Sequence, residues 1–328
     1  MRRVLFLKSL RFRRLRLSAS AGCAAVALAL ATGSAQPAAA ASFPVDYHFD
    51  IGFVAGFLSP TQAPAGANNW SCRPSAAHPF PVVLVHGTFE NMNDNWGGAS
   101  PLLADNGYCV FAFNYGGSSA SSPIQGTGDI TASAAQLATF VNSVLAATGA
   151  AKVDLVGHSQ GGMMPRYYLN FLGGGAKVND FVAFAPSNYG TTLDGITKLA
   201  SLLGVAGQIN GALTSVCPAC VQQEQGSAFL AGLNATPTVP GVRYTVIEST
   251  GDEVVTPYTN AFLPAAANVT NITVQHQCVL DGSDHLEIAA DPIAMADMLN
   301  ALDPSHQVRV PCLVVLPVTG PVGPVPAL

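Results

Sequence analysis

One short stretch of the chain has the residue types and the spacing of a serine nucleophile. Gly157-His-Ser-Gln-Gly161 reads G-x-S-x-G, follows the apolar run 153–156 and precedes a segment with helical spacing. In that context the pattern is typical of a sharp strand-to-helix turn that lifts the serine hydroxyl clear of a sheet, and the glycines leave room for the turn. Free backbone N–H groups at the start of the helix can stabilise a developing negative charge. The motif predicts Ser159 as the nucleophile of an acyl transfer.

A serine hydroxyl needs a histidine to accept its proton and a carboxylate to orient that histidine. In doubly wound hydrolases the order along the chain is serine, acid, histidine. Asp252 follows the expected strand 242–247, and His285 lies in a glycine-containing loop further on. Both positions have this order, so we predict Asp252 as the acid and His285 as the base.

Other candidates for these two roles remain. Glu253 directly follows Asp252 and is the alternative acid, whereas Asp281 and Asp284 lie too near His285 in sequence to be favoured. His158 occupies the second position of the serine motif and is expected to point elsewhere. His86 is expected to have a structural role in its loop, and His276 is expected to pack within a strand.

The elements that must position these residues alternate along the chain. Short apolar runs predict strands at 81–85, 109–113, 153–156, 181–184, 242–247 and 272–280, and helical spacing predicts helices at 129–147, from the serine motif to 172, and at 292–302. This alternation indicates an α/β fold, in which a mostly parallel, doubly wound sheet has helices on both faces. Residues 191–233 are poor in strand signals and predict a helical insertion before the acid residue.

The rest of the mature chain is organised around this domain. We expect one catalytic domain at 80–312, preceded by an N-terminal extension with little periodicity at 42–79 and followed by a Pro-rich tail at 313–328. Leu316-Pro-Val-Thr-Gly320 in the tail matches a sortase sorting pattern. Such signals continue into an apolar stretch and a basic tail, and only eight residues follow, so we do not expect an anchor.

The first 41 residues have the order of an export signal. A basic stretch is followed by an Ala-rich apolar run at 19–31 and by small residues at 38–41. We expect a signal peptide at 1–41 that is cleaved near Ala41. Its apolar run is short for a permanent anchor. Paired arginines leave both the general and the twin-arginine export routes open.

Composition and charge exclude other classes. The chain has 328 residues, of which 49% are hydrophobic, and a formal charge of −5. That apolar fraction excludes a disordered protein. Seven of the 14 basic residues lie in the first 18 residues, and all 19 acidic residues follow them. The mature chain is therefore strongly acidic, which excludes a nucleic-acid partner.

The cysteines fit an exported protein. Six remain after the expected cleavage: Cys72, Cys109, Cys217, Cys220, Cys278 and Cys312. An even number suggests three disulfides, for which 15 pairings are possible. Cys217-Pro-Ala-Cys220 could serve redox chemistry or half a zinc site. The sequence has no second such motif and no clustered histidines that would complete a metal site. We therefore expect Cys217 and Cys220 to form a disulfide that closes a small loop. We expect no metal and no cofactor.

Several motifs together resemble a known family. They are Val85-His-Gly-Thr88, Gly157-His-Ser-Gln-Gly-Gly162, Thr250-Gly-Asp-Glu-Val-Val-Thr-Pro257 and Asp284-His-Leu286. Across about residues 70–312 the chain resembles the secreted α/β-hydrolase lipases of bacteria, above all the actinobacterial class-2 lipases, with local similarity to the yeast lipase B type. Residues 42–70 have no clear counterpart in the short family members, and no calcium-site pattern is present.

The resemblance has specific implications. It implies hydrolysis of triacylglycerols or other carboxylic esters through an acyl-enzyme intermediate, with Ser159, Asp252 and His285 as the triad. It implies an oxyanion hole made by the backbone N–H groups of Thr88 and Gln160, with the Thr88 hydroxyl as a third donor. It also implies the disulfides Cys72–Cys109 and Cys278–Cys312. We expect a secreted monomer that acts on a lipid or ester substrate, also at a lipid–water interface, without a permanent membrane anchor.

Alternatives on the same scaffold remain open. An acyltransferase would pass the acyl group to an alcohol, and a polyester or cutin hydrolase would cleave a different ester. A non-catalytic binding protein is not favoured, because Ser, Asp and His are all present in order. The apolar residues of 196–213, interrupted by Gly204, Gly207 and Gly211, predict one or two short helices. These either pack in the core or border the acyl chain of the substrate.

Overall fold

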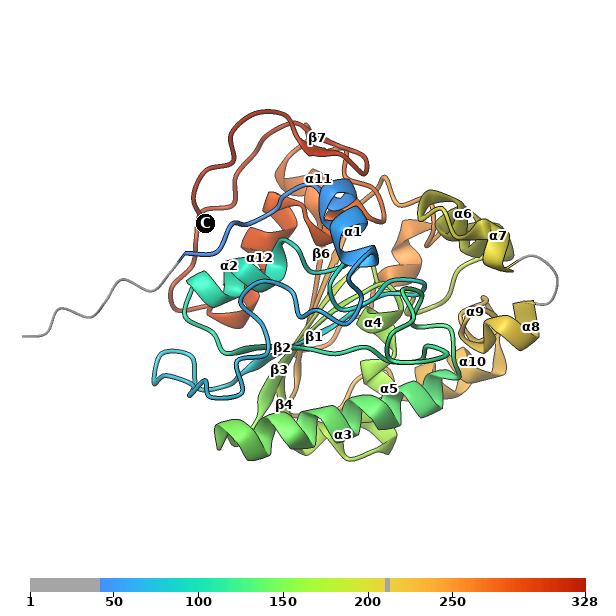
Figure 1. The fold of residues 1–328 in the computed structure, drawn as a ribbon, viewed down its shortest axis with the longest axis horizontal. Coiled ribbons are helices and arrows are strands. Elements are labelled where there is room, and N and C mark those ends of the chain that lie inside the picture. The colour runs from blue at the N-terminus through green and yellow to red at the C-terminus, as the bar shows by residue number, and fades with distance from the viewer. Residues whose placement is uncertain (1–41, 210–212) are drawn as a thin grey trace, which may run out of the picture. The chain divides into compact units, whose positions relative to one another are not determined.

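A sheet of six parallel strands forms the centre of the computed structural model, which describes residues 42–209 and 213–328 (Figure 1). The strands are β1 (Val82–Val85), β2 (Val110–Ala112), β3 (Val153–His158), β4 (Val178–Phe184), β5 (Arg243–Glu248) and β6 (Val269–Thr273), and their order in the sheet is β2-β1-β3-β4-β5-β6. β1 to β4 are almost entirely buried, as expected for strands covered on both faces. The expected signal segment, 1–41, lies outside the described residues.

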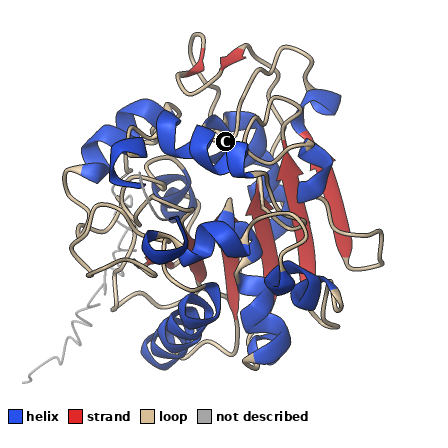
Figure 2. Ribbon diagram, turned by 90° about the vertical axis from the view of Figure 1, so that its right-hand side faces the viewer, coloured by secondary structure: helices blue, strands red, loops and turns tan. Residues whose placement is uncertain are grey.

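Helices cover both faces of the sheet (Figures 1 and 2). α2 (Ala99–Asp105) and α12 (Pro292–Leu302) lie on one side, and α3 (Ile130–Thr148) and α5 (Pro165–Phe171) lie on the other. In α3 the Asp129 side chain accepts a hydrogen bond from the backbone N–H of Ala132 at the first turn, and Gly149 ends the helix in the left-handed conformation. Within the described residues, α3 is the one helix long and apolar enough to cross a membrane; here one face of it is buried.

The predicted α/β fold is confirmed, but the expected bounds of two strands are wrong: β4 starts at Val178 and not at 181, and β6 lies earlier in the chain than expected. Residues 272–280 were expected to form the last strand, whereas β6 ends at Thr273 and is followed by the short helix α11 (Val274–Gln277). Thr273 pairs with Glu248, the last residue of β5, so the chain beyond it has no neighbouring strand with which to pair. His276 accordingly lies in a helix and not in a strand.

The N-terminal extension contains a helix that the sequence analysis missed. α1 spans Phe49–Phe57, and its aromatic rings contact one another in sequence, with 5.8 Å between the centroids of Phe49 and Phe53 and 5.5 Å between those of Phe53 and Phe57. The spacing of four residues places the three rings on one side of the helix. That regularity was present in the sequence, but it spans only two turns.

The helical insertion lies between β4 and β5, as predicted. It consists of α6 (Leu193–Leu202), α7 (Ala206–Ile209), α8 (Leu213–Val216), α9 (Pro218–Gln222) and α10 (Ala228–Asn234). Gly204 has φ +70° and separates α6 from α7. Leu203 is buried and Leu202 is half-buried. Ile209 and Leu213 were expected on the apolar face, but the structure does not describe the side chains of 208–214. The expected break at Gly211 also lies outside the described residues.

Three disulfides are formed by the described cysteines: Cys72–Cys109, Cys217–Cys220 and Cys278–Cys312. These are the pairs expected from chain proximity and from the resemblance. The first joins the N-terminal extension to the segment before β2. The third joins the end of α11 to Cys312, directly before the C-terminal tail, and the second closes the first turn of α9.

The C-terminal tail folds back onto the sheet domain. β7 (Val315–Leu316) and β8 (Gly320–Pro321) form a small hairpin, which takes in the sortase-like motif. The backbone N–H of Gly282 donates to the Val315 carbonyl (3.0 Å), and that of Val318 donates to the Asp284 carboxylate (3.3 Å). The tail therefore contacts residues 281–287, which we call the histidine loop because they include His285.

Candidate active site

Ser159 sits at the turn between β3 and the short helix α4 (Gln160–Met163). Its backbone has φ +54° and ψ −122°, a conformation that L-residues rarely adopt. A side chain at Gly157 would place its Cβ 1.9 Å from the Gly161 carbonyl oxygen, and one at Gly161 would come within 2.0 Å of the Val85 carbonyl oxygen. Only glycine fits at both positions. The sheet thus holds the strained serine at the carboxyl end of its strands.

An uninterrupted line of hydrogen bonds runs from Ser159 to Asp252. The distance from His285 Nε2 to Ser159 Oγ is 3.0 Å, and that from His285 Nδ1 to Asp252 Oδ2 is 2.7 Å. The other oxygen of Asp252 accepts from the backbone N–H groups of Val254 (2.7 Å) and Val255 (2.8 Å), which fix the carboxylate. The structure brings together the three residues that sequence reasoning selected.

The alternative acids have other partners. Asp281 accepts from the backbone N–H of Ser283 (2.7 Å), and Asp284 accepts from that of Glu287 (2.8 Å), so both shape the histidine loop. The carboxylate that meets the imidazole is that of Asp252 and not of Glu253.

The electrostatic surroundings favour a basic imidazole. Complete burial alone would lower the pKa of His285, but the charge and hydrogen bond of Asp252, together with the charges of Glu90 and Glu253, outweigh burial, so this pKa lies above its ordinary value. A raised pKa makes the imidazole a stronger proton acceptor at the moment when serine attacks.

Glu248 is a neighbour of the site that the sequence analysis missed. It ends β5, is completely buried and accepts from the backbone N–H of Ser249 (2.8 Å). Burial first, and then the charge of Asp252, raise the pKa of Glu248 well above its ordinary value. The raised pKa favours the protonated form of Glu248, next to Asp252.

A second histidine–carboxylate pair lies behind the first. His158 Nε2 lies 2.8 Å from the main-chain carbonyl of His285, so this nitrogen carries a proton, and His158 Nδ1 lies 3.1 Å from Glu90 Oε2. The same Glu90 oxygen accepts from the backbone N–H of Gly87 (2.9 Å). His158 thus bonds the main chain of His285 and not its imidazole, although the two ring centroids are only 5.2 Å apart. The pair connects the backbone of His285 to the loop after β1.

That loop also carries Thr88, the first of the two expected oxyanion residues. Thr88 and Gln160 are both buried, and within residues 42–209 and 213–328 neither of their backbone N–H groups donates to another group of the protein. Gln160 Nε2 donates to Thr88 Oγ1 (2.7 Å), so the two residues are in direct contact. Two free donors beside the nucleophile can bind a negatively charged oxygen.

Metal chemistry has no cluster of ligands to support it in the described part of the chain. No group of three or more His, Cys, Asp or Glu side chains there could hold an ion. The arrangement of Ser159, His285 and Asp252 has the geometry that acyl transfer requires.

Comparisons with known proteins agree with the fold. Lipase B of Aspergillus fumigatus has a TM-score of 0.55 and 22% sequence identity, with 76% of this chain and 57% of that one covered. A mature lipase of Bacillus licheniformis has a TM-score of 0.51 and 20% identity, with 74% and 99% covered. At these identities the likeness concerns the fold alone.

Sequence comparisons identify the family. Triacylglycerol lipases of Pseudarthrobacter phenanthrenivorans and Burkholderia plantarii are each 42% identical over 97 residues, which is 28% of this chain and 28% and 25% of theirs. The chain thus matches only about a quarter of the length of these curated relatives. The sequence pattern of the family described as Lipase (class 2) matches residues 79–296, about two thirds of the chain. The chain therefore belongs to the class 2 lipase family.

Proposed function

We propose that this protein is a secreted triacylglycerol lipase that hydrolyses carboxylic esters through an acyl-enzyme intermediate, with Ser159, His285 and Asp252 as its catalytic triad. The observation that carries the proposal is the line of hydrogen bonds from Ser159 Oγ through the imidazole to Asp252. Family membership and the names of the two curated relatives support the lipid ester as substrate.

The chemistry follows from this geometry. His285 Nε2 takes the proton of Ser159 Oγ while the oxygen attacks the ester carbonyl, and Asp252 stabilises the imidazolium that forms. The backbone N–H groups of Thr88 and Gln160 receive the carbonyl oxygen as it becomes negative. The imidazolium then protonates the leaving alcohol, which departs and leaves an acyl-serine. Water repeats the sequence, with His285 again as the base, and releases the fatty acid.

Export is part of the proposal. Three disulfides in the described residues are typical of a protein that folds in an oxidising compartment. The basic and apolar front end is the expected signal. N-terminal sequencing of protein from the culture medium should find a start near residue 42.

The triad makes a direct prediction. Ser159→Ala should leave the protein folded and lower kcat by about 10⁴-fold or more, because the members of a triad act as a unit. Asp252→Asn should be similarly severe, because the imidazole loses the acceptor that orients it. Glu253→Gln is the matched control and should retain most of the activity. Near-normal kcat in Asp252→Asn together with a large loss in Glu253→Gln would refute the acid assignment.

A substrate profile tests the chemical class. Initial rates on p-nitrophenyl esters of increasing chain length, on triglyceride emulsions and on a polyester film distinguish a lipase from a polyester hydrolase. Product analysis with an added alcohol tests for acyl transfer. Preference for the film, or for the alcohol over water, would overturn the proposed activity but not the triad.

A further inference from the structure

The Thr88 hydroxyl is surrounded by two buried glutamine side chains. Gln160 Nε2 lies 2.7 Å and Gln223 Nε2 lies 2.9 Å from Thr88 Oγ1. All three residues are at least 98% buried, so water does not compete for these contacts. Gln223 comes from the helical insertion, directly after α9, and is 135 residues from Thr88 in sequence.

The orientation of both amides follows from their other partners. Gln160 Nε2 also donates to the carbonyl of Gly126 (2.7 Å). Gln223 Nε2 also faces the carbonyl of Ala219 (3.2 Å), and its Oε1 accepts from the Ser187 hydroxyl (2.8 Å). A carbonyl oxygen can only accept, so in each side chain the nitrogen, and not the oxygen, faces these carbonyls and Thr88.

The valence of the hydroxyl then determines the direction of its proton. A threonine oxygen has two lone pairs and one proton. Both lone pairs accept N–H donors, from Gln160 and from Gln223, so the proton cannot point at either amide. No group within the described residues accepts it. The proton remains available to a negatively charged oxygen beside the backbone N–H groups of Thr88 and Gln160.

We propose that Gln223 is a positioning residue of the oxyanion hole, which turns the Thr88 hydroxyl proton toward the reacting carbonyl oxygen by occupying a lone pair of Thr88. This inference rests on the proposed function and extends it to the insertion. Gln223 does not touch the substrate in this scheme. It fixes a hydroxyl rotor before the reaction, so that no reorientation is needed as charge develops.

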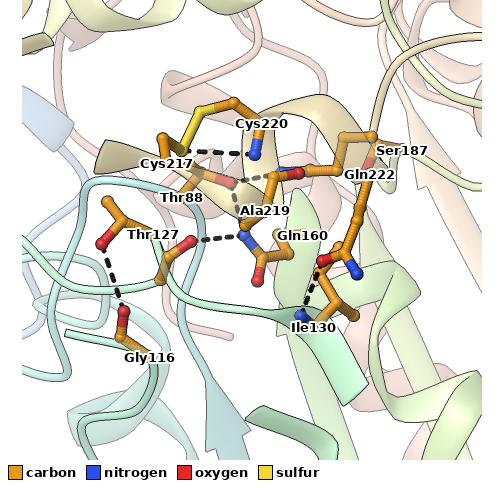
Figure 3. Close-up of a disulfide and its surroundings, with 12 residues drawn as sticks. Thr88, Gly116, Thr127, Ile130, Gln160, Ser187, Cys217, Ala219, Cys220 and Gln222 are labelled. Carbon is orange, nitrogen blue, oxygen red and sulfur yellow. Dashed lines mark hydrogen bonds between the residues drawn. A yellow bond between two sulfur atoms is a disulfide. The ribbon is translucent and has the colours of Figure 1, made fainter. Parts of the chain in front are cut away.

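The insertion is attached firmly enough for this role (Figure 3). The Cys217–Cys220 disulfide closes the first turn of α9, and the backbone N–H of Ala219 donates to the Thr127 carbonyl (3.1 Å). Gln222 bridges to the start of α3, where its Oε1 accepts from the Ile130 N–H (2.8 Å) and its Nε2 donates to Asp129 (2.8 Å). These bonds hold the segment from which Gln223 reaches Thr88.

Two substitutions of Gln223 separate positioning from packing. Gln223→Leu removes the donor, frees the hydroxyl rotor and should lower kcat about 10-fold, with a much smaller change in KM, because the interaction matters only in the transition state. Gln223→Glu keeps the shape but offers an acceptor when ionised, which draws the Thr88 proton away from the hole. Its kcat relative to wild type should therefore fall further as pH rises, whereas that of Gln223→Leu should not.

Gln222→Leu is the matched control. It removes the neighbouring glutamine, which ties the same segment to α3 but does not contact Thr88, and should keep kcat within about twofold of wild type. Thr88→Val completes a double-mutant cycle, in which Gln223→Leu should have almost no further effect on kcat once the hydroxyl is absent. Melting temperatures of all variants identify any that fail to fold.

The outcomes are distinguishable from failure of the proposed function. If Ser159→Ala abolishes activity but Gln223→Leu has wild-type kcat, the triad stands and the positioning role is wrong. The role is equally wrong if the Gln223→Leu loss is fully additive with Thr88→Val, or if Gln222→Leu loses as much. Retained activity in Ser159→Ala would overturn the proposed function itself.

Discussion

His285 has opposing influences on its protonation, and their balance predicts the pH dependence of the reaction. Burial is the largest single influence and lowers its pKa, but the carboxylates around it, Asp252 first and then Glu90 and Glu253, together raise the pKa further than burial lowers it. Only the neutral imidazole can accept the serine proton, so kcat/KM should fall about tenfold per pH unit below this pKa. Because the pKa is raised, the fall should begin above pH of about 6.5, the ordinary value for histidine. A pH–rate profile on a soluble ester tests this, and a fall confined to lower pH would contradict it.

The residues of the proposed triad could be selected from the sequence because a local motif and a chain order specify them. Glu248, Glu90 and Gln223 could not. Glu90 and Gln223 contact residues that are distant in the sequence: Glu90 lies 68 residues from His158, and Gln223 lies 135 residues from Thr88. Glu248 matters because it is buried next to Asp252. Glutamine and glutamate are common surface residues, so neither the types nor the spacing of these three residues predicts that their side chains are buried. Their roles become visible only when the sheet brings the loops together.

The insertion is the element that links several parts of the site. The backbone N–H of Thr191 donates to the Gln223 carbonyl (2.9 Å), and the Thr191 hydroxyl donates to the carbonyl of Val254, beside the acid residue. α6 buries Ile196, Leu199 and Ala200. One face of this helix therefore packs in the core, while Leu202 is half-buried.

A substitution on this helix tests whether it borders the lipid. Leu203 is buried, so an aspartate there would destabilise the fold and give no information on substrate binding. Leu202→Asp places the charge at a half-buried position. It should lower activity on emulsified triglyceride at least about tenfold more than on p-nitrophenyl acetate, since each acyl methylene buried contributes about 0.8 kcal/mol. Equal losses on both substrates would assign Leu202 to the core.

The types and the order of the helices and strands were predictable because apolar residues at regular spacing and glycines at helix ends are local signals in the sequence. α3 and α12 lie within two residues of their expected positions. The end of β6 was not predictable, because it depends on where the neighbouring β5 ends. α1 was missed because its three phenylalanines interrupt a segment otherwise rich in turn residues.

At the scale of the whole molecule, both the N-terminal extension and the C-terminal tail contact the histidine loop. The backbone N–H of Phe49 donates to Glu287 (3.1 Å), and that of Asp50 donates to the Val318 carbonyl (3.2 Å). Burial first, and then the charges of Asp291 and Asp284, raise the pKa of Glu287 to about 10, although the Phe49 N–H opposes them. Glu287 is therefore protonated in the folded protein at neutral pH.

Stability should depend on pH through this carboxyl. Its folded-state pKa is above the unfolded value, so the stabilisation is complete below the unfolded pKa of about 4.3 and is lost as pH rises toward 10. The Glu287→Gln side chain cannot ionise. Between pH 5 and 9 the free energy of unfolding of this variant should therefore fall less steeply than that of the wild type, by up to about 1.4 kcal/mol per pH unit. Urea unfolding at several pH values measures this, with the exposed Asp194→Asn as the charge control. Parallel pH dependence in all three proteins would refute it.

The contact between the tail hairpin and the histidine loop has a consequence for when, during biosynthesis, the protein becomes active. The ribosome makes His285 before it makes Val315 and Val318, whose backbone groups hold the loop around that histidine. A nascent chain thus contains every residue of the proposed triad before it contains the backbone groups of residues 315 and 318 that hold the loop around His285. We expect esterase activity to appear only after residues 315–318 have been made and have folded against the histidine loop.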